Sequence, residues 1–395
     1  MRLIFFSLLI FNWISVGCSD NPEQWSTQKT KSFPSQKEII IPAPELKKDE
    51  LRQAGRIDSF IQSLVKLKVF NGNILIAKKG KIIYQKQYGI ADSKSKKALK
   101  VNSVYQLASV SKTLTSTLIL LLAQEGKIDI KKKVAEYLPG FPYTDVSVEN
   151  LLTHRSGLPN YINFTEKYVK PDSAGFTNKD IFDVMKKHVP AIYAKPDKVF
   201  DYSNTNYFLL SMIAEKVSGK DFEKLMREKI FVPLKMKNTY FFSETSKIPD
   251  SIRTAGHDEK MRKLLPEQFD KVKGDKGIFS TTNDLFLFME AYYNHKLLNK
   301  DLLLAATTPK SREKKKSNYG YGWRMKEYET PEKVVFHNGW WRGYRTALHR
   351  IYKDSTTVVV LTNNLLNTAY RVKDFVDVMN GIKPNSKDSE HPNEH

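Results

Sequence analysis

The chain of 395 residues has a single cysteine, Cys18, which excludes disulfide bonds within the chain. Its eight histidines are dispersed and no His-Glu-x-x-His motif occurs, so nothing in the sequence argues for a zinc centre. The Gly-x-Ser-x-Gly turn that carries the nucleophile of α/β-hydrolases is missing too, and we find no internal repeat. We therefore expect no disulfide framework, and no motif points to a metal centre.

Acidic residues are scarce relative to basic ones. The chain has 43 Asp and Glu against 64 Lys and Arg, which gives a formal net charge of +21. Such an excess can indicate nucleic-acid binding, but the lysines are scattered through every segment and no zinc-finger or RNP pattern occurs. We expect no nucleic-acid partner, and the charge favours attraction to an anionic membrane or wall surface instead.

Only one long apolar run occurs, at residues 3–16, and it is too short to span a bilayer comfortably. It follows the positive Met1-Arg2 and ends at Cys18, which resembles a bacterial lipoprotein signal, although Ser15 replaces the usual aliphatic residue. The alternatives are an ordinary secretory signal and an incidental buried cysteine. We expect a signal peptide at 1–17, a lipid on Cys18, and an exported protein anchored to a membrane, facing the periplasm or cell exterior.

The rest of the chain divides into a polar, Pro-containing tether at 18–50, a domain at 51–382 and a polar tail at 383–395. Helical spacing begins at residue 51, and a hairpin follows at 73–77 and 82–88. Strand patterns return late, at residues 321–325, 334–337, 344–351 and 356–362, before a last helix across 370–379. This order predicts an α/β protein of the α+β type. Its antiparallel sheet would come from both chain ends, flanked by terminal helices, with an inserted all-helical subdomain at about 104–310.

The segment around Ser109 carries the first candidate for chemistry. Ser-x-x-Lys occurs five times, but only Ser109 and Lys112 open a strongly apolar helix, at 114–123. A hydroxyl is favoured as a cap where a helix begins, and a lysine three residues later lies on the same face. A lysine kept neutral by its surroundings can accept the proton of a serine nucleophile. The positive field of the helix N-terminus suits the negative charge that develops in acyl transfer.

Two later motifs complete the pattern. Tyr202-Ser203-Asn204 follows 93 residues after Ser109, and its Tyr-x-Asn pattern also occurs at two other tyrosines. The sequence His337-Asn338-Gly339-Trp340 contains the only His-x-Gly of the chain and lies at the end of a predicted strand. Each motif is weak alone, so their order carries the information.

Ser-x-x-Lys, then Tyr-x-Asn, then Lys-x-Gly or His-x-Gly on a late strand resembles the serine β-lactamases and penicillin-binding proteins. The spacing is similar to the class C branch and its esterase and peptidase relatives. Supporting segments lie at residues 126–130, 149–159, 201–204 and 277–281, and the resemblance covers about 55–365. It implies a β-lactamase/transpeptidase-like fold without metal or cofactor.

The resemblance also implies roles for single residues. Ser109 would be the acylated nucleophile, Lys112 its proton partner, and Tyr202 the base that activates Ser109 and then water. Asn204 would hydrogen-bond an amide of the substrate, and the backbone N–H groups of Ser109 and Trp340 would form the oxyanion hole. Which of Lys112 and Tyr202 carries the charge stays open, because coupled groups titrate as a pair.

The third motif departs from the β-lactamase pattern. His337 stands where β-lactamases proper usually carry lysine, and a mostly neutral imidazole attracts a substrate carboxylate less. With Gly339 and Trp340 it is expected to bind substrate; the alternative is a strand-end imidazole satisfied by a neighbour. Trp340 and Trp341 add bulk that could narrow the pocket. A catalytic His154 is disfavoured, because no nucleophile elbow accompanies it.

These residues predict a serine hydrolase that cleaves an amide or ester through an acyl-enzyme on Ser109. Candidates are a D-amino-acid-type peptidase or carboxypeptidase, an esterase, and a true β-lactamase, of which His337 makes the last the least favoured. The substrate would be a small peptide, an ester or a cell-wall-type molecule. The alternative from another class is a penicillin-binding or sensor protein with little or no turnover.

Overall fold

The structure is a computed structural model that describes residues 45–172, 175–310, 317–326 and 332–384. The predicted signal peptide, Cys18, most of the tether and the tail from residue 385 onward lie outside the described residues. Helix α1 already begins at Lys48, so the folded part starts slightly before the predicted boundary at 51. Among the helices of the described ranges, none is both long and apolar enough to cross a membrane.

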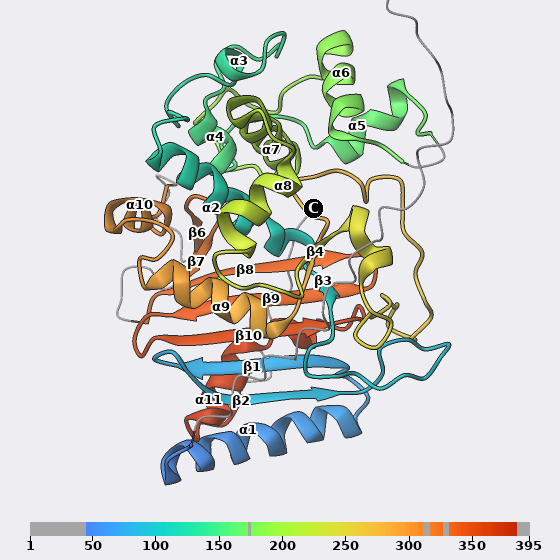
Figure 1. Ribbon diagram of the computed structural model, residues 1–395, viewed down its shortest axis with the longest axis vertical. Helices are drawn as coiled ribbons and strands as arrows, with labels where there is room; N and C mark the ends of the chain where they lie inside the picture. The colour runs from blue at the N-terminus through green and yellow to red at the C-terminus, as the bar shows by residue number, and fades with distance from the viewer. Residues whose placement is uncertain (1–44, 173–174, 311–316, 327–331, 385–395) are drawn as a thin grey trace, which may run out of the picture. The chain divides into compact units, whose positions relative to one another are not determined.

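A seven-stranded antiparallel sheet is built from both ends of the chain (Figure 1). Its strand order is β2-β1-β10-β9-β8-β7-β6, so the N-terminal hairpin joins the C-terminal strands through the pairing of β1 with β10. The strands are β1 (Gly72–Lys78), β2 (Lys81–Tyr88), β6 (Ser317–Tyr319), β7 (Arg324–Lys326), β8 (Val334–Trp341), β9 (Tyr344–Ile351) and β10 (Thr356–Thr362). This arrangement confirms the predicted sheet from both chain ends.

One face of the sheet packs against the two terminal helices, α1 (Lys48–Lys66) and α11 (Val372–Met379) (Figure 1). Strand β1 shows how the sequence divides its side chains. Ile74 and Ile76 belong to the core beneath these helices, whereas Leu75 and Ala77 belong to the core under the helical layer. Successive side chains of a strand point to opposite faces, so a continuous apolar run indicates a strand buried on both sides.

The other face carries the helical layer and its connecting loops (Figure 1). Its helices are η1 (Ala108–Val110), α2 (Ser111–Gln124), α3 (Val134–Tyr137), α4 (Val148–Leu152), α5 (Tyr161–Tyr168), α6 (Asn178–His188), α7 (Thr205–Ser218), α8 (Phe222–Met226), η2 (Arg227–Phe231), η3 (Phe242–Lys247), α9 (Thr282–Tyr293) and α10 (Lys300–Ala306). A short helix, η4 (Asn367–Tyr370), precedes α11.

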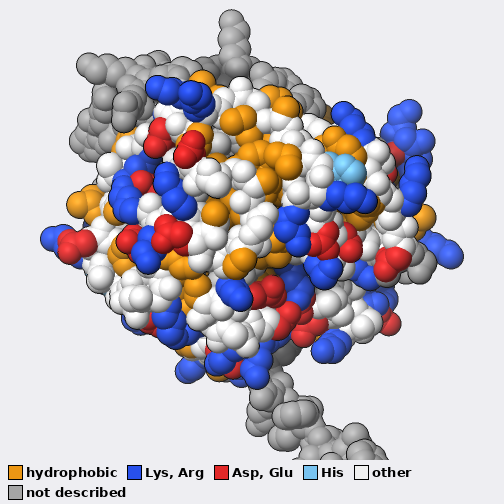
Figure 2. Space-filling view, turned by 90° about the horizontal axis from the view of Figure 1, so that it is seen from above, with side chains coloured by type: hydrophobic (Ala, Val, Ile, Leu, Met, Phe, Trp, Pro, Cys, Tyr) orange, Lys and Arg blue, Asp and Glu red, His pale blue; other side chains and the backbone are white. Residues whose placement is uncertain are grey.

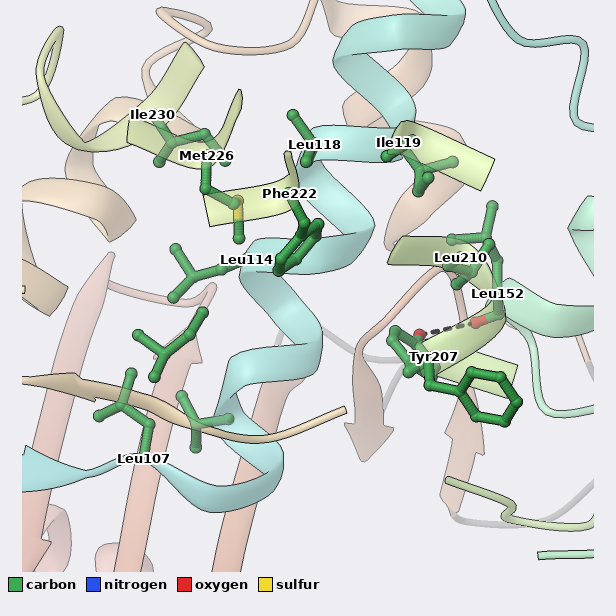
Figure 3. Packing of buried hydrophobic residues seen from close by; sticks show 14 of the residues in the cluster. Leu107, Leu114, Leu118, Ile119, Leu152, Tyr207, Leu210, Phe222, Met226 and Ile230 are labelled. Atoms are coloured by element: carbon green, nitrogen blue, oxygen red, sulfur yellow. Dashed lines mark hydrogen bonds between the residues drawn. The ribbon is translucent and has the colours of Figure 1, made fainter. Parts of the chain in front are cut away.

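Helix α2 runs through the middle of this layer and is buried along most of its length. Figure 3 shows Leu114 and Leu118 of α2 near Phe222 and Met226, with α7 on the opposite side of the helix. Burial of one such apolar side chain contributes roughly 1.5–3 kcal/mol, so the packed residues together hold α2 firmly. The residues at the start of α2, including the predicted nucleophile, are therefore held on a rigid support.

The inserted region is not purely helical. Three short strands, β3 (Tyr105–Gln106), β4 (Tyr240–Phe241) and β5 (Ile278–Ser280), form a small sheet in the order β3-β5-β4. Strands of two or three residues are too short for an alternating pattern, so the sequence did not predict them. The predicted strand at 321–325 also differs, because Gly322 has φ +80° and forms a turn before β7.

On the face shown in Figure 2, the basic residues are spread rather than concentrated. Figure 2 views the molecule from the end at which α3 and α6 lie, and on that face Lys and Arg are interspersed with Asp and Glu. Several are ion-paired, such as Lys179 with Asp183 at 2.5 Å. This face therefore offers no single basic patch.

Candidate active site

Ser109 lies in the tight turn η1, between strand β3 and helix α2. The residue before it, Ala108, has φ +50°, a left-handed conformation that costs a non-glycine residue roughly 1–2 kcal/mol. The structure does not use the Ser109 hydroxyl as a helix cap, because Val110 is the N-cap of α2 and makes no side-chain cap bond. The hydroxyl instead faces the amine of Lys112. Backbone strain such as that at Ala108 is typical of functional sites.

Lys112 is fully buried, and oxygen atoms of Ser109, Asn204 and Asp275 are among the partners of its amine. The Nζ atom lies 3.1 Å from Ser109 Oγ, 2.8 Å from Asn204 Oδ1 and 2.9 Å from the backbone oxygen of Asp275. An ammonium group has three donors and no acceptor, so this arrangement suits a protonated lysine. Lys112 thereby joins the first two predicted motifs in one hydrogen-bonded unit.

Tyr202 and Asn204 lie just before and at the start of α7. The ring centroid of Tyr202 lies 5.1 Å from Lys112 Nζ and 5.0 Å from the guanidinium carbon of Arg324. Two cations within about 6 Å of one aromatic ring form favourable cation–π contacts, and they also favour negative charge on the tyrosine oxygen. The geometry thus suits Tyr202 for the predicted role of base.

His154 supports the loop that carries Tyr202. Its ring lies 4.2 Å from the Tyr202 ring, and its Nδ1 accepts hydrogen bonds from the Ser203 backbone at 3.3 Å and the Asn206 amide at 2.9 Å. Burial, with the nearby charges of Lys112 and Arg324, holds the pKa of His154 well below its usual value. A buried, neutral imidazole that fixes a loop agrees with the structural role expected for it.

The glycine of the third motif lets strand β8 approach the nucleophile. A Cβ atom on Gly339 would lie 2.3 Å from the Leu107 backbone oxygen and 3.1 Å from Ala108 Cβ, so a side chain does not fit. The Thr346 hydroxyl donates to the same Leu107 oxygen at 2.8 Å. This contact packs strand β8 against the turn that holds Ser109, and Ser109 and Trp340 line the same cavity; the oxyanion hole itself stays a prediction.

His337 lies in the protein interior, with no exposed surface. Its Nδ1 lies 2.7 Å from the Asn338 carbonyl oxygen and its Nε2 lies 3.1 Å from the Tyr319 hydroxyl. Burial and the charges of Arg324 and Lys112 lower the pKa of His337 well below its usual value, so the ring is neutral at pH 7. Nδ1 then donates to the carbonyl and Nε2 accepts from Tyr319. This placement differs from the predicted substrate-binding role, because both ring nitrogens are already used.

A cavity of about 360 Å³ opens beside Ser109. It is lined by Ala108, Ser109, Asn160, Ile162, Asn163, Tyr202, Asn204, Glu267, Lys276, Trp340 and Trp341. Trp340 is 44% exposed, so it stands at the rim, where bulk would narrow the opening as predicted. Neither Lys112 nor His337 lines it. A larger cavity of about 670 Å³, which includes Gln106, contains none of the motif residues, so we assign the site by its chemistry rather than by volume.

The cavity has one cationic and one anionic lining residue that the sequence analysis did not single out. Lys276 is buried, contacts the Tyr161 hydroxyl and lies 3.1 Å from the carboxylate of Asp275, which balances its charge. Glu267 lies 3.4 Å from Arg342, and burial raises the pKa of its carboxyl. Within the described ranges, no group of three or more His, Cys, Asp or Glu residues is placed to hold a metal ion.

Comparisons with known proteins agree with this fold. The family model described as Beta-lactamase matches residues 57–379. A penicillin-binding protein of Bacillus subtilis (strain 168) is 31% identical over 80% of this chain and 72% of its own length. A teichoic acid D-alanine hydrolase of Staphylococcus aureus is 26% identical over 83% of this chain and 78% of its own. The structure of the octameric penicillin-binding protein homologue from Pyrococcus abyssi matches with a TM-score of 0.72 at 27% identity, over 84% and 78% of the two chains.

Proposed function

The chain belongs to the Beta-lactamase family and is a serine hydrolase of that fold, and on this premise we propose that it hydrolyses D-alanyl esters or amides of cell-wall-type molecules. The observation that carries the proposal is the buried amine of Lys112, which contacts both Ser109 and Asn204. Nucleophile, proton partner and amide-binding residue are thereby held in one unit beside the cavity.

We propose that the reaction uses these groups as follows. Tyr202 removes the proton of the Ser109 hydroxyl as Ser109 Oγ attacks the substrate carbonyl, while the charge on Lys112 stabilises the ionised tyrosine. The N–H groups of Ser109 and Trp340 receive the negative oxygen of the tetrahedral intermediate. The proton then passes to the leaving alcohol or amine. Tyr202 next activates water, which hydrolyses the acyl-enzyme and frees Ser109.

The charges around the cavity favour a substrate with an amino group rather than a carboxylate near the scissile bond. The imidazole of His337 is neutral and buried, and the charge of Lys276 is balanced by Asp275, so neither suits an anionic substrate. Glu267 also lines the cavity; its carboxylate lies 3.4 Å from Arg342, and we propose that it binds the ammonium of a free alanyl group in addition to this contact. The relative that is a teichoic acid D-alanine hydrolase supports the same substrate class.

A substrate panel tests the proposal. We expect the purified protein to hydrolyse a D-alanyl ester faster than its L-alanyl isomer, and faster than it hydrolyses a penicillin. Steady-state rates and intact-protein mass spectrometry, measured in parallel, separate turnover from stalled acylation. Hydrolysis of the L-isomer at an equal or higher rate would contradict the D-alanyl assignment.

Glu267→Gln is expected to raise KM for a D-alanyl ester about tenfold while leaving its N-acetylated analogue unchanged, because only the former carries a charge for the carboxylate to bind. The matched control is Glu136→Gln, at an exposed position of α3. Equal effects on both substrates would show that Glu267 does not recognise the ammonium.

A second candidate function is a penicillin-binding protein that acylates and turns over slowly. The relative from Bacillus subtilis favours it, since it is a penicillin-binding protein. The same mass measurement distinguishes the two, because this alternative gives a long-lived penicilloyl adduct on Ser109 and no ester turnover.

For its location, we propose export and a lipid on Cys18. Cys18→Ser is expected to release the protein from membranes, since the +21 charge alone gives only salt-sensitive attachment. The measurement is fractionation followed by a high-salt wash. A Cys18→Ser protein that stays with the membrane after the wash contradicts the lipid anchor.

A further inference from the structure

Several ionisable groups surround Tyr202 in the described part of the chain. Lys112 of α2 and Arg324 of β7 lie 5.1 and 5.0 Å from its ring centroid. The rings of His154, Tyr319 and His337 lie 4.2, 6.4 and 6.3 Å away. Tyr207 of α7 is a further neighbour of Tyr202. The pKa of Tyr207 is raised mainly by burial, and Tyr202 is among the residues that contribute to the shift.

Only two of these neighbours bring positive charge. The pKa values of His154 and His337 are both well below the usual value, mainly because the rings are buried, so neither imidazole is charged near pH 7. Tyr207, whose pKa is raised by burial, is neutral there too. Among these described neighbours, the positive charge near Tyr202 therefore comes from Lys112 and Arg324.

The position of Arg324 relates it to the third motif. Arg324 pairs with Phe336 in the β7–β8 register. It therefore lies on the strand next to that of His337, opposite the residue that precedes His337. In this chain the residue of the motif itself is neutral, and a cation reaches the same tyrosine from the neighbouring strand. An arginine keeps its charge at every pH at which the enzyme could work.

We propose that Arg324 is a positioning residue that stabilises the ionised form of Tyr202, supplying from β7 the charge that His337 does not provide. The inference rests on the proposed function, because it assumes that Tyr202 acts as the base. A positive charge at this distance favours the phenolate over the phenol. Without the charge of Arg324, Tyr202 loses its proton only at a higher pH. Activity near neutral pH therefore falls, whereas activity at high pH approaches that of the wild type.

The experiment is the pH dependence of kcat/KM for a D-alanyl ester, measured on the full chain between pH 5.5 and about 10. Arg324→Met is expected to move the acidic limb upward by about one pH unit or more, which lowers activity about tenfold on that limb. Arg324→Lys should keep the limb near its wild-type position, since the charge remains. Lys326→Met is the matched control, because Lys326 lies on the same strand but over the ring of Phe336.

A purely structural role for Arg324 would lower kcat/KM equally at every pH and leave the limb in place, and that result would overturn the proposal. A second readout does not need activity. The near-ultraviolet tyrosinate titration that is lost in Tyr202→Phe should shift upward in Arg324→Met, and Arg324→Gln serves if the methionine variant does not fold. If a fluorophosphonate probe fails to label wild-type Ser109, the proposed function fails; if labelling succeeds and neither titration moves, only this inference fails.

Discussion

Ser109→Ala is expected to abolish both hydrolysis and labelling by a fluorophosphonate probe. Loss of the nucleophile of a serine hydrolase typically lowers the rate by on the order of 10⁴ to 10⁶. The hydroxyl is the group that Lys112 contacts at 3.1 Å beside the cavity, so another residue cannot take its place without moving. The measurement is kcat with a D-alanyl ester, together with intact mass after exposure to the probe.

Ser111→Ala is the matched control for the nucleophile. Ser111 is fully buried two residues further on, and its hydroxyl accepts a hydrogen bond from the Ile278 backbone at 3.4 Å, so it contacts the small sheet instead. We expect its variant to be labelled nearly as fast as wild type. Labelling of Ser109→Ala at the wild-type rate would show that the nucleophile is another residue, and Ser111 would be examined next.

Much of the fold follows from local patterns in the sequence. The end of α7 is an example, since Gly219 follows the helix in a left-handed conformation with φ +66°, which glycine adopts readily and which commonly ends a helix. The burial of β1 and β10 on both faces and the position of α2 likewise follow from continuous apolar runs in the sequence. The small sheet of β3, β4 and β5 is different, because Gln106 pairs with Phe279 through contacts between distant segments.

The residues of the candidate site likewise divide into those that a sequence motif predicts and those that no local pattern marks. Ser109, Tyr202 and Asn204 were predicted because their spacing carries a motif, and the structure brings them to one cavity. Glu267 and Lys276 lie in the long connection between β4 and β5, where no periodic pattern or motif marks them. Their positions depend on how this connection folds against the hairpin of β8 and β9, through contacts such as that between Arg342 and Glu267. Short sequence patterns do not contain that information.

His337 illustrates a limit of motif reasoning. The motif identifies its place on β8, and the residue type indicates weaker attraction for anions. The burial of its side chain and the use of both nitrogens depend on Tyr319 of β6, two strands away. The charge that the motif lacks is brought by Arg324, which belongs to no motif. A motif therefore indicates which residues lie together in the site. The charge in that site depends also on residues of the neighbouring strands.

The second prediction concerns the two groups that handle the proton. Lys112→Ala and Tyr202→Phe are each expected to remove most of the activity, and the double variant should be little worse than the more damaging single change. Groups that act as one unit give losses that do not add, because the second substitution removes a step that has already failed. The measurement is kcat/KM for wild type, both single variants and the double variant at one pH.

The two substitutions should differ in their effect on stability. Tyr202→Phe keeps the ring that packs against His154 at 4.2 Å, so we expect little change in the melting temperature. Lys112→Ala leaves the oxygens of Asn204 and Asp275 without their buried donor, which costs roughly 1–3 kcal/mol for each group that stays unsatisfied. Rates are therefore compared at a temperature at which all four proteins are folded. Losses that multiply in the double variant would mean that Lys112 and Tyr202 act in separate steps, and the shared proton-transfer role would then be wrong.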